Sequence, residues 1–140
     1  MRRVASGLAP AALGVALMMA FGVEPAASHH AFGFYEMQKT QEIRGTVTKY
    51  EWSNPHSWLF VTVPSADGPT DYGFEMVSVG EMLRRGWAKN SVKPGDTINV
   101  TFHPLRDGRK GGLLLAAKSG DGKLIGKPIP PQPPQPPPAP

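Results

Sequence analysis

Four histidines are the side chains of this sequence best suited to chemistry, because the chain contains no cysteine. His29 and His30 are neighbours near the N-terminal end, whereas His56 and His103 each stand alone. Histidine is the commonest metal ligand in proteins, and the lack of cysteine excludes thiolate zinc sites and thiol catalysis. The four residues therefore predict one metal site, provided that the fold brings distant segments together.

Residues 1–28 have the composition of a cleavable signal peptide. Two arginines near the start precede an uncharged apolar run, and Ala26 and Ser28 occupy the small-residue positions that a signal peptidase reads. The run is shorter than the about 20 apolar residues that cross a membrane, and no basic cluster follows it. We therefore expect an exported protein, periplasmic or secreted, that keeps no stable membrane span after cleavage.

The position of the cut decides what the first histidines can do. If the cut follows Ser28, His29 becomes the first residue, and its new amine and its imidazole chelate one metal ion. If it follows Ala27, the second choice, the chain starts Ser28-His29-His30, and a histidine in third place binds Cu(II) together with the amine and two backbone amides. Nitrogen ligands favour Cu(II) over the other first-row divalent ions. Copper is therefore the cofactor that either start predicts.

Composition divides the remaining chain into three parts. Residues 29–40 form an N-terminal arm, residues 41–126 carry the signals of one small domain, and residues 127–140 are proline-rich with glutamine spacers. Such a tail buries no apolar surface, so we expect it to be disordered and to contribute nothing to folding. The formal net charge is only +4, without runs of like charge, and names no polyanionic partner.

Five strand signals and one helix signal follow one another in the central part. In the helix signal SVGEMLRRGW, Ser78 is the expected N-cap, Glu81 its capping-box partner and Gly86 the stop. In the first strand the alternation changes phase between Val47 and Tyr50, which predicts a β-bulge. We expect the strands at 42–52, 56–64, 71–76, 97–103 and 113–119, and the helix at 80–85. This β-β-β-α-β-β order predicts an all-β fold with one short helix, an OB-fold-like five-stranded Greek-key barrel.

Five motifs occur in order along the chain: HHAF after the leader, GTVTKYEWSNPHSW, FEMVSVGEMLRRGW, KPGD and HPLRDGRKGG. Together they resemble a family of small exported bacterial proteins that is catalogued as domain of unknown function 6152. The resemblance extends to about Leu124 and leaves out the proline-rich tail. It implies an exported OB-like barrel and no established activity. In that family a proline often follows the serine that opens the helix, where this chain has Val79.

The OB-fold also predicts where the isolated histidines lie, because the loop between its first two strands and the loop between its last two flank one binding face. His56 falls in the first loop, and His103 ends the fourth strand with a parity opposite to that of Phe102. We therefore expect both on one open rim, outside the core. The extended arm spans up to roughly 36 Å and reaches this rim. The predicted ligands are His29, His30, His56 and His103, to which Glu75, Met37, Met76 or Met82 could add a donor.

Two other interpretations stay open at this point. The histidines could be a solvated chain end and loop residues that bind the backbone. The protein could also be an adaptor of the cell envelope that binds a small ligand or a protein through the rim residues Trp52, Asn54, Trp58 and Arg106. Nucleic-acid binding is not expected, because export removes most such partners. An enzyme is not expected, because the chain has no G-x-S-x-G motif and no readable acid–base pair.

Overall fold

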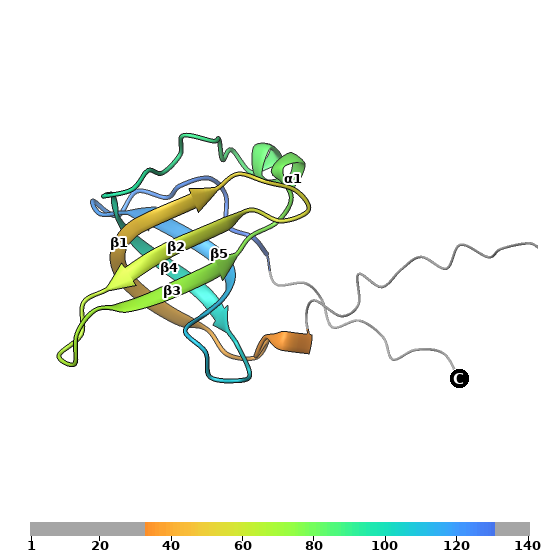
Figure 1. Ribbon diagram of the computed structural model, residues 1–140. Coiled ribbons are helices and arrows are strands. Elements are labelled where there is room, and N and C mark those ends of the chain that lie inside the picture. Colours follow the sequence, from red (N-terminus) through yellow and green to blue (C-terminus); the bar gives the residue numbers. More distant parts are fainter. Residues whose placement is uncertain (1–32, 131–140) are drawn as a thin grey trace, which may run out of the picture.

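Five strands of the computed structural model, which describes residues 33–130, close into a barrel (Figure 1). The strand order around the barrel is β1-β2-β3-β5-β4, and β1 pairs with β4 to close it. All neighbouring strands are antiparallel except β3 and β5, which are parallel. The elements are β1 (Gln41–Glu51), β2 (Trp58–Val63), β3 (Thr70–Glu75), α1 (Val79–Arg84), β4 (Thr97–Pro104) and β5 (Gly111–Ser119). The prediction of an OB-like barrel with one short helix is confirmed.

The long first strand contains the predicted bulge. The register between β1 and β2 shifts between Val47 and Lys49, where the apolar alternation changes phase. Such an extra residue bends a strand, and this bend lets β1 pair with β2 along one half and with β4 along the other. The phase change in the sequence was therefore a correct signal for closure of the barrel.

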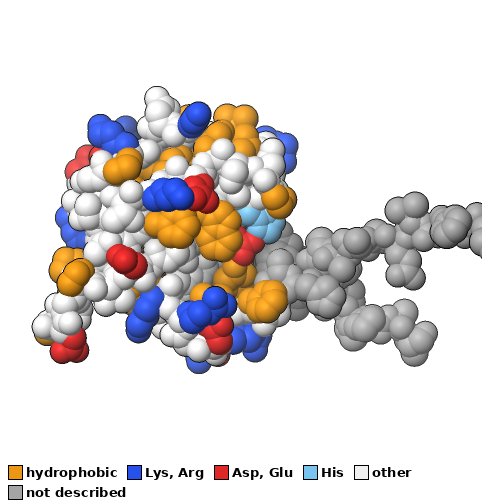
Figure 2. Space-filling view, in the orientation of Figure 1, with side chains coloured by type: hydrophobic (Ala, Val, Ile, Leu, Met, Phe, Trp, Pro, Cys, Tyr) orange, Lys and Arg blue, Asp and Glu red, His pale blue; other side chains and the backbone are white. Residues whose placement is uncertain are grey.

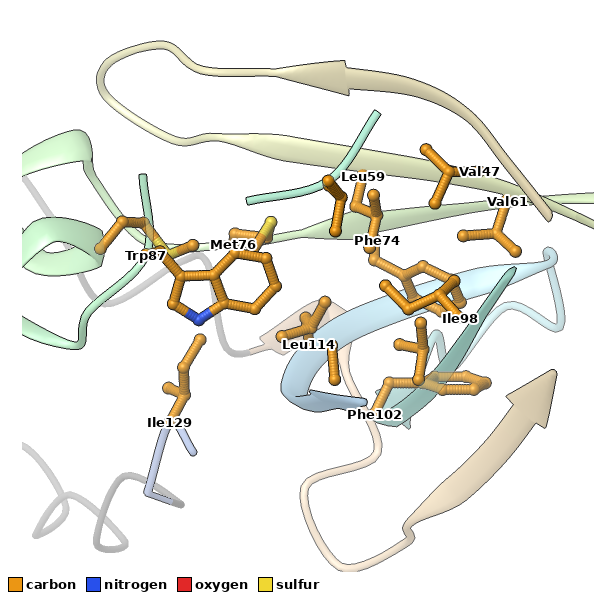
Figure 3. Packing of buried hydrophobic residues seen from close by; sticks show 14 residues of the cluster. Val47, Leu59, Val61, Phe74, Met76, Trp87, Ile98, Phe102, Leu114 and Ile129 are labelled. Carbon is orange, nitrogen blue, oxygen red and sulfur yellow. The ribbon is translucent and has the colours of Figure 1, made fainter. Parts of the chain in front are cut away.

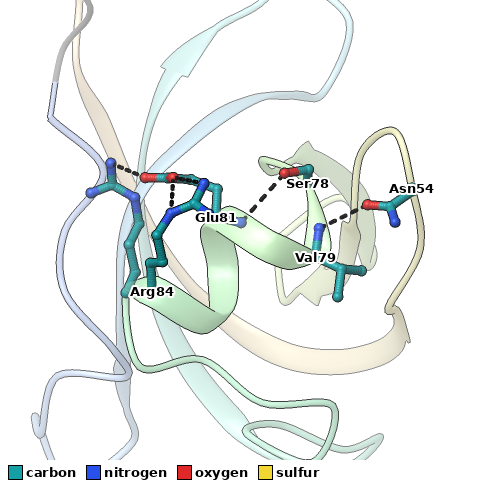
Figure 4. A network of polar contacts seen from close by, with 6 residues as sticks. Asn54, Ser78, Val79, Glu81 and Arg84 are labelled. Atoms are coloured by element: carbon teal, nitrogen blue, oxygen red, sulfur yellow. Dashed lines mark hydrogen bonds and ion pairs between the residues drawn. The ribbon is translucent and has the colours of Figure 1, made fainter.

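The short helix α1 begins and ends where its capping residues predict. The Ser78 side chain accepts a hydrogen bond from the Glu81 backbone amide, and Gly86 adopts a positive φ of 80° directly after the C-cap (Figure 4). The Glu81 carboxylate does not complete the capping box. It binds the guanidinium groups of Arg84 and Arg85 instead. The helix starts at Val79, one residue earlier than expected.

The core is built from the inward-facing residues of all five strands (Figure 3). Along β2 and β4 the buried residues alternate with more exposed ones, as period-2 packing requires. Two of the three methionines considered as copper ligands, Met76 and Met82, lie in this core with at most 1% of their surface exposed. Core filling is therefore their role. The largest fully buried side chains include Trp87, Phe74, Phe102, Leu59, Ile98 and Leu114.

The chain segments that precede and follow the barrel in the sequence also pack against it, which corrects the predicted boundaries of the folded unit. On the N-terminal side, Tyr35 is buried and forms a bridge with Leu105. On the C-terminal side, Ile129 is 7% exposed, its backbone amide donates to the Leu115 carbonyl at 2.6 Å, and its side chain lies next to Trp87 (Figure 3). The expected disordered tail from residue 127 therefore contains a docked stretch, because an isoleucine interrupts the prolines there.

Several expectations concern residues outside the described range. The predicted signal peptide, His29 and His30 precede residue 33, and most of the proline-rich tail follows residue 130. Within residues 33–130, no helix is long and apolar enough to cross a membrane.

Candidate functional site

A polar cluster at one end of the barrel joins three segments that are distant in the sequence. His56 lies in the loop between β1 and β2, Glu75 ends β3, and Tyr35 belongs to the segment that precedes β1. The Tyr35 hydroxyl donates to Glu75 Oε2, and His56 Nδ1 contacts Glu75 Oε1. A carboxylate only accepts hydrogen bonds, so in the neutral imidazole this contact places the proton on Nδ1 and leaves the lone pair on Nε2.

The strands determine this geometry. Glu75 pairs with Trp58 across β2 and β3, and both residues point to the outer face because their neighbours Phe74 and Leu59 face the core. The His56 carbonyl accepts a hydrogen bond from the Ser53 hydroxyl at 2.9 Å, which closes the loop before β2. The His56 side chain keeps 41% of its surface exposed, whereas Glu75 keeps only 13%. The cluster therefore presents an oriented imidazole to solvent above a mostly covered carboxylate.

The tyrosine of the cluster is held in its neutral form. Burial raises the pKa of Tyr35 well above its usual value, and the hydrogen bond to Glu75 and the charge of Glu75 raise it further. The positive charge of Arg109 acts on the pKa of Tyr35 in the opposite direction. Tyr35 is therefore a stable hydrogen-bond donor that attaches the N-terminal segment to β3.

His103 does not lie on an open rim, and that prediction is wrong. Its side chain leaves the barrel on the outer face, as the parity indicated, but only 3% of the residue is exposed. Its Nδ1 lies 2.6 Å from the Lys39 carbonyl, and the Glu36 amide donates to the neighbouring Pro104 carbonyl. The N-terminal segment therefore covers the end of β4. His103 Nε2 is enclosed and has no hydrogen-bond partner within residues 33–130.

The four residues predicted to bind a ligand or a partner divide into different roles. Trp52 packs partly buried against the core and meets Tyr50 edge to face. The Asn54 side chain accepts a hydrogen bond from the Val79 amide at 3.0 Å and so joins the β1–β2 loop to the start of α1 (Figure 4). Arg106 Nε donates to the Tyr35 carbonyl at 2.9 Å. Only Trp58 of the four lines a surface groove of the apolar type that the adaptor interpretation requires.

That groove lies on the outer face of β2 and β3 and has a volume of about 360 Å³. Figure 2 shows hydrophobic side chains gathered on this face, beside a histidine, an acidic side chain and several basic ones. Strands 2 and 3 and the loops beside them form the usual ligand face of OB-folds. The lining residues are Phe34, Tyr35, Trp58, Gly73, Glu75, Leu105, Arg109, Lys110 and Gly112.

The sequence reasoning missed the most connected residue of the site, Tyr35. A signal was present, because Phe34 and Tyr35 form an aromatic pair in a segment that was expected to be a plain arm. Large aromatic side chains bury much surface when they find a partner. An aromatic pair directly before the first strand could therefore have predicted that the arm packs on the barrel.

No three histidine, aspartate or glutamate side chains within residues 33–130 are grouped so that they could hold one metal ion. Of the two histidines in that range, His56 has the exposed side chain, because His103 is enclosed. The other two predicted ligands, His29 and His30, lie before residue 33, outside the described range.

Fold and site together define a small OB-like barrel with a groove on its strand 2–3 face and a carboxylate-bound histidine at one end of that groove. A family model matches residues 17–116, and the chain belongs to this family of unknown function, DUF6152. No curated protein matches the chain.

One solved structure with a similar fold is a mitochondrial single-stranded DNA binding protein, Rim1 from S. cerevisiae. It shares 12% sequence identity with this chain, and the match has a TM-score of 0.43. It covers 64% of this chain and 95% of the other. A likeness at this level indicates nothing about what this chain binds.

Proposed function

We propose that this protein is an exported binding protein of the cell envelope, periplasmic or secreted, that holds one copper ion beside His56. The ligands are His56 Nε2 together with the amine and the imidazole of His29 at the start of the processed chain. His30 is a helper or a replacement when the cut falls one residue earlier. The enclosed His103 is left out of the ligand set.

The observation that carries this proposal is the contact between His56 and Glu75. Metal-binding histidines usually donate their second ring N–H to a carboxylate or a carbonyl, which fixes the tautomer and raises the basicity of the ligand nitrogen. His56 has this arrangement, with Nδ1 on Glu75 and a side chain that stays 41% exposed.

The course of the N-terminal segment supports the same site. Tyr35 and His56 share the Glu75 carboxylate, so the chain that leads back to His29 starts beside His56. Tyr35 lies six positions after His29, and an extended chain of this length spans up to roughly 20 Å. The start of the processed chain can therefore reach His56. An all-nitrogen donor set of this kind favours Cu(II).

The test uses exported protein with its natural start, which mass spectrometry should locate at His29 or, second, at Ser28. Metal analysis and calorimetric titration should show one equivalent of Cu(II), bound more tightly than Zn(II). An N-terminal extension should weaken binding by about tenfold or more, because it removes the amine as a ligand. A chain that keeps Met1 after export would contradict the proposal.

Two asparagine variants form a matched pair for the same titration. Asparagine places an amide nitrogen near the position of Nδ1, so His56→Asn keeps a donor for Glu75 and removes only Nε2. His103→Asn keeps the donor for the Lys39 carbonyl in the same way. We expect weaker Cu(II) binding in His56→Asn, by about tenfold or more, and unchanged binding in His103→Asn. If Cu(II) binding is unchanged in His56→Asn, His56 is not a ligand and the copper is bound by the start of the processed chain alone.

A second candidate function is an adaptor of the cell envelope that binds a non-metal ligand or a protein. The groove beside Trp58 is the observation that favours it. The two functions differ in their response to the N-terminal extension, because an adaptor does not need a free amine. If the extension leaves all binding unchanged, the adaptor becomes the leading function.

A further inference from the structure

One aromatic wall of the groove, Trp58, packs against the ring of Phe60, which lies next to the lining. The rings of Trp58 and Phe60 stack with their centroids 6.3 Å apart and their planes 18° from parallel. The Lys49 ammonium lies 5.8 Å from the centre of the Phe60 ring. Phe34, on another part of the wall, keeps 62% of its surface exposed. A ring bound here would cover apolar surface that the fold leaves open, without reordering Trp58.

The floor of the groove is open at Gly73, where a larger residue would project a side chain. Gly73 faces outward on β3, opposite Phe60, and a Cβ atom at this position would lie 3.4 Å from the Phe60 ring. That distance is ordinary van der Waals contact, so the position tolerates a side chain sterically. Gly112 also lines the groove, but a Cβ atom there would meet the His103 carbonyl and the Phe102 ring instead. The space is therefore open to a flat group, and a larger residue at position 73 would occupy it.

The charges around the groove favour an anion at one end. Arg109 and Lys110 line it from the loop between β4 and β5. Arg109 is paired with Asp107, whereas no ion pair is found for Lys110 within residues 33–130. Glu75 is the acidic residue of the lining, and the Tyr35 hydroxyl and His56 Nδ1 already contact its two oxygens. Lys110 is therefore more available to a ligand than the carboxylate.

The size of the groove limits the ligand to one or two rings. A volume of about 360 Å³ falls at the low end of small-molecule sites. A nucleic-acid strand would need a row of cations that follows its backbone. Here the basic side chains of the lining come from one loop. A short ligand fits this arrangement better than a polymer.

We infer that this groove is a binding site for a small acidic ring compound. Its ring lies against Trp58 and Phe34, and its carboxylate or phosphate faces Arg109 and Lys110. The ring can be an aromatic acid or an acidic sugar, which share this chemistry. The site uses neither His56 Nε2 nor the start of the chain as a ligand. It therefore stands or falls independently of copper.

The test titrates the full processed chain, kept metal-free with a chelator, with four probes observed by saturation-transfer NMR and tryptophan fluorescence. Phenyl phosphate and glucuronic acid are the two acidic probes, and benzyl alcohol and glucose are their neutral counterparts. We expect one acidic probe to bind about tenfold more tightly than its neutral counterpart, because only the acid uses the basic side chains. The acid that binds identifies the ring class. No binding of either acid at millimolar concentration would overturn the inference.

Three variants assign the binding to this groove. Trp58→Ala removes the wall, Gly73→Val fills the floor, and the double variant Arg109→Ala/Lys110→Ala removes the charge. Each variant should weaken binding of the acidic probe by about tenfold or more. The matched control is Lys89→Ala/Lys93→Ala, two exposed lysines between α1 and β4, which should bind as the parent does. Equal weakening in the control, or unchanged binding in Trp58→Ala with its native fold shown by circular dichroism, would contradict the site.

Discussion

His56 and His103 leave the same outer face of the barrel, but their surroundings differ completely. His56 contacts Glu75 on β3 and keeps 41% of its side chain exposed, whereas His103 on β4 is enclosed and contacts the Lys39 carbonyl. Leu113 on β5 pairs with Glu75 on one side and with His103 on the other, so β5 lies between β3 and β4 and roughly 10 Å separates the latter two strands. Both histidines lie on the outer side of the sheet, so this orientation does not explain their difference in exposure. His103 is enclosed because the N-terminal segment lies over it.

The largest expected effect is on stability. His103→Ala removes a buried ring and its bond to the N-terminal segment, so the free energy of unfolding should fall by roughly 2–4 kcal/mol. His56→Ala should cost less than about 1 kcal/mol, because the ring is half exposed. Urea denaturation of both variants measures the difference. Equal losses would show that exposure does not separate the two residues.

The C-terminal segment tests whether a covering segment stabilises the barrel in general. A chain that ends at Gly126 loses Ile129, and burial of one isoleucine side chain contributes roughly 1.5–3 kcal/mol. We expect its melting temperature to fall by several degrees. A chain that ends at Pro130 should melt as the full chain does. If both truncations leave the melting temperature unchanged, the docked segment contributes nothing and the original boundary at 126 is adequate.

A smaller effect is expected when only the attachment point of the N-terminal segment is changed. Tyr35→Phe keeps the ring and removes the hydrogen bond to Glu75, which should cost about 1 kcal/mol in urea denaturation. Amide hydrogen exchange should then increase in the segment before β1 and at the covered end of β4. An increase spread evenly over the barrel would show that Tyr35 does not act locally on this segment.

The smallest expected effect appears only in alkaline solution. Burial raises the pKa of Tyr35 above its unfolded value of about 10, so the native state keeps its proton longer than the unfolded state does. This contribution to stability is complete below pH 10 and is lost as the pH rises through the native value. Tyr35→Phe should therefore lose stability less steeply above pH 10 than the parent. Burial also raises the pKa of Tyr50, so the stability of Tyr50→Phe should likewise fall less steeply above pH 10 than that of the parent. Parallel curves for parent and variants would contradict this.

The local features of the fold were readable from the sequence because each depends on a few neighbouring residues. Side-chain alternation predicts the order of the strands along the chain and the bulge after Val47. Backbone conformations that particular residues favour predict the Ser78 cap and the turn at Gly86. The loop position of His56 followed from the same signals. The family model that covers residues 17–116 agrees with the resemblance seen in the motifs.

The environment of each predicted site residue depended on segments that strand parity does not describe. Parity placed His103 correctly on the outer face, but Tyr35 and the chain around it cover that face. Asn54 was expected at a binding rim. Instead its side chain accepts a hydrogen bond from the backbone amide of Val79, the first residue of α1, which lies 25 residues later in the sequence. These contacts arise because distant polar groups must find partners once the barrel has closed.

Sequence alone thus determined the class of fold and the order of its elements, since hydrophobic period and capping act over a few residues. Only the tertiary structure decided which histidine stays open, which aromatic residues line the groove and where the folded unit ends. Those properties depend on long-range packing, in which a segment outside the barrel either covers a side chain or leaves it to solvent. One buried tyrosine before the barrel and one buried isoleucine after it in the sequence made that difference here.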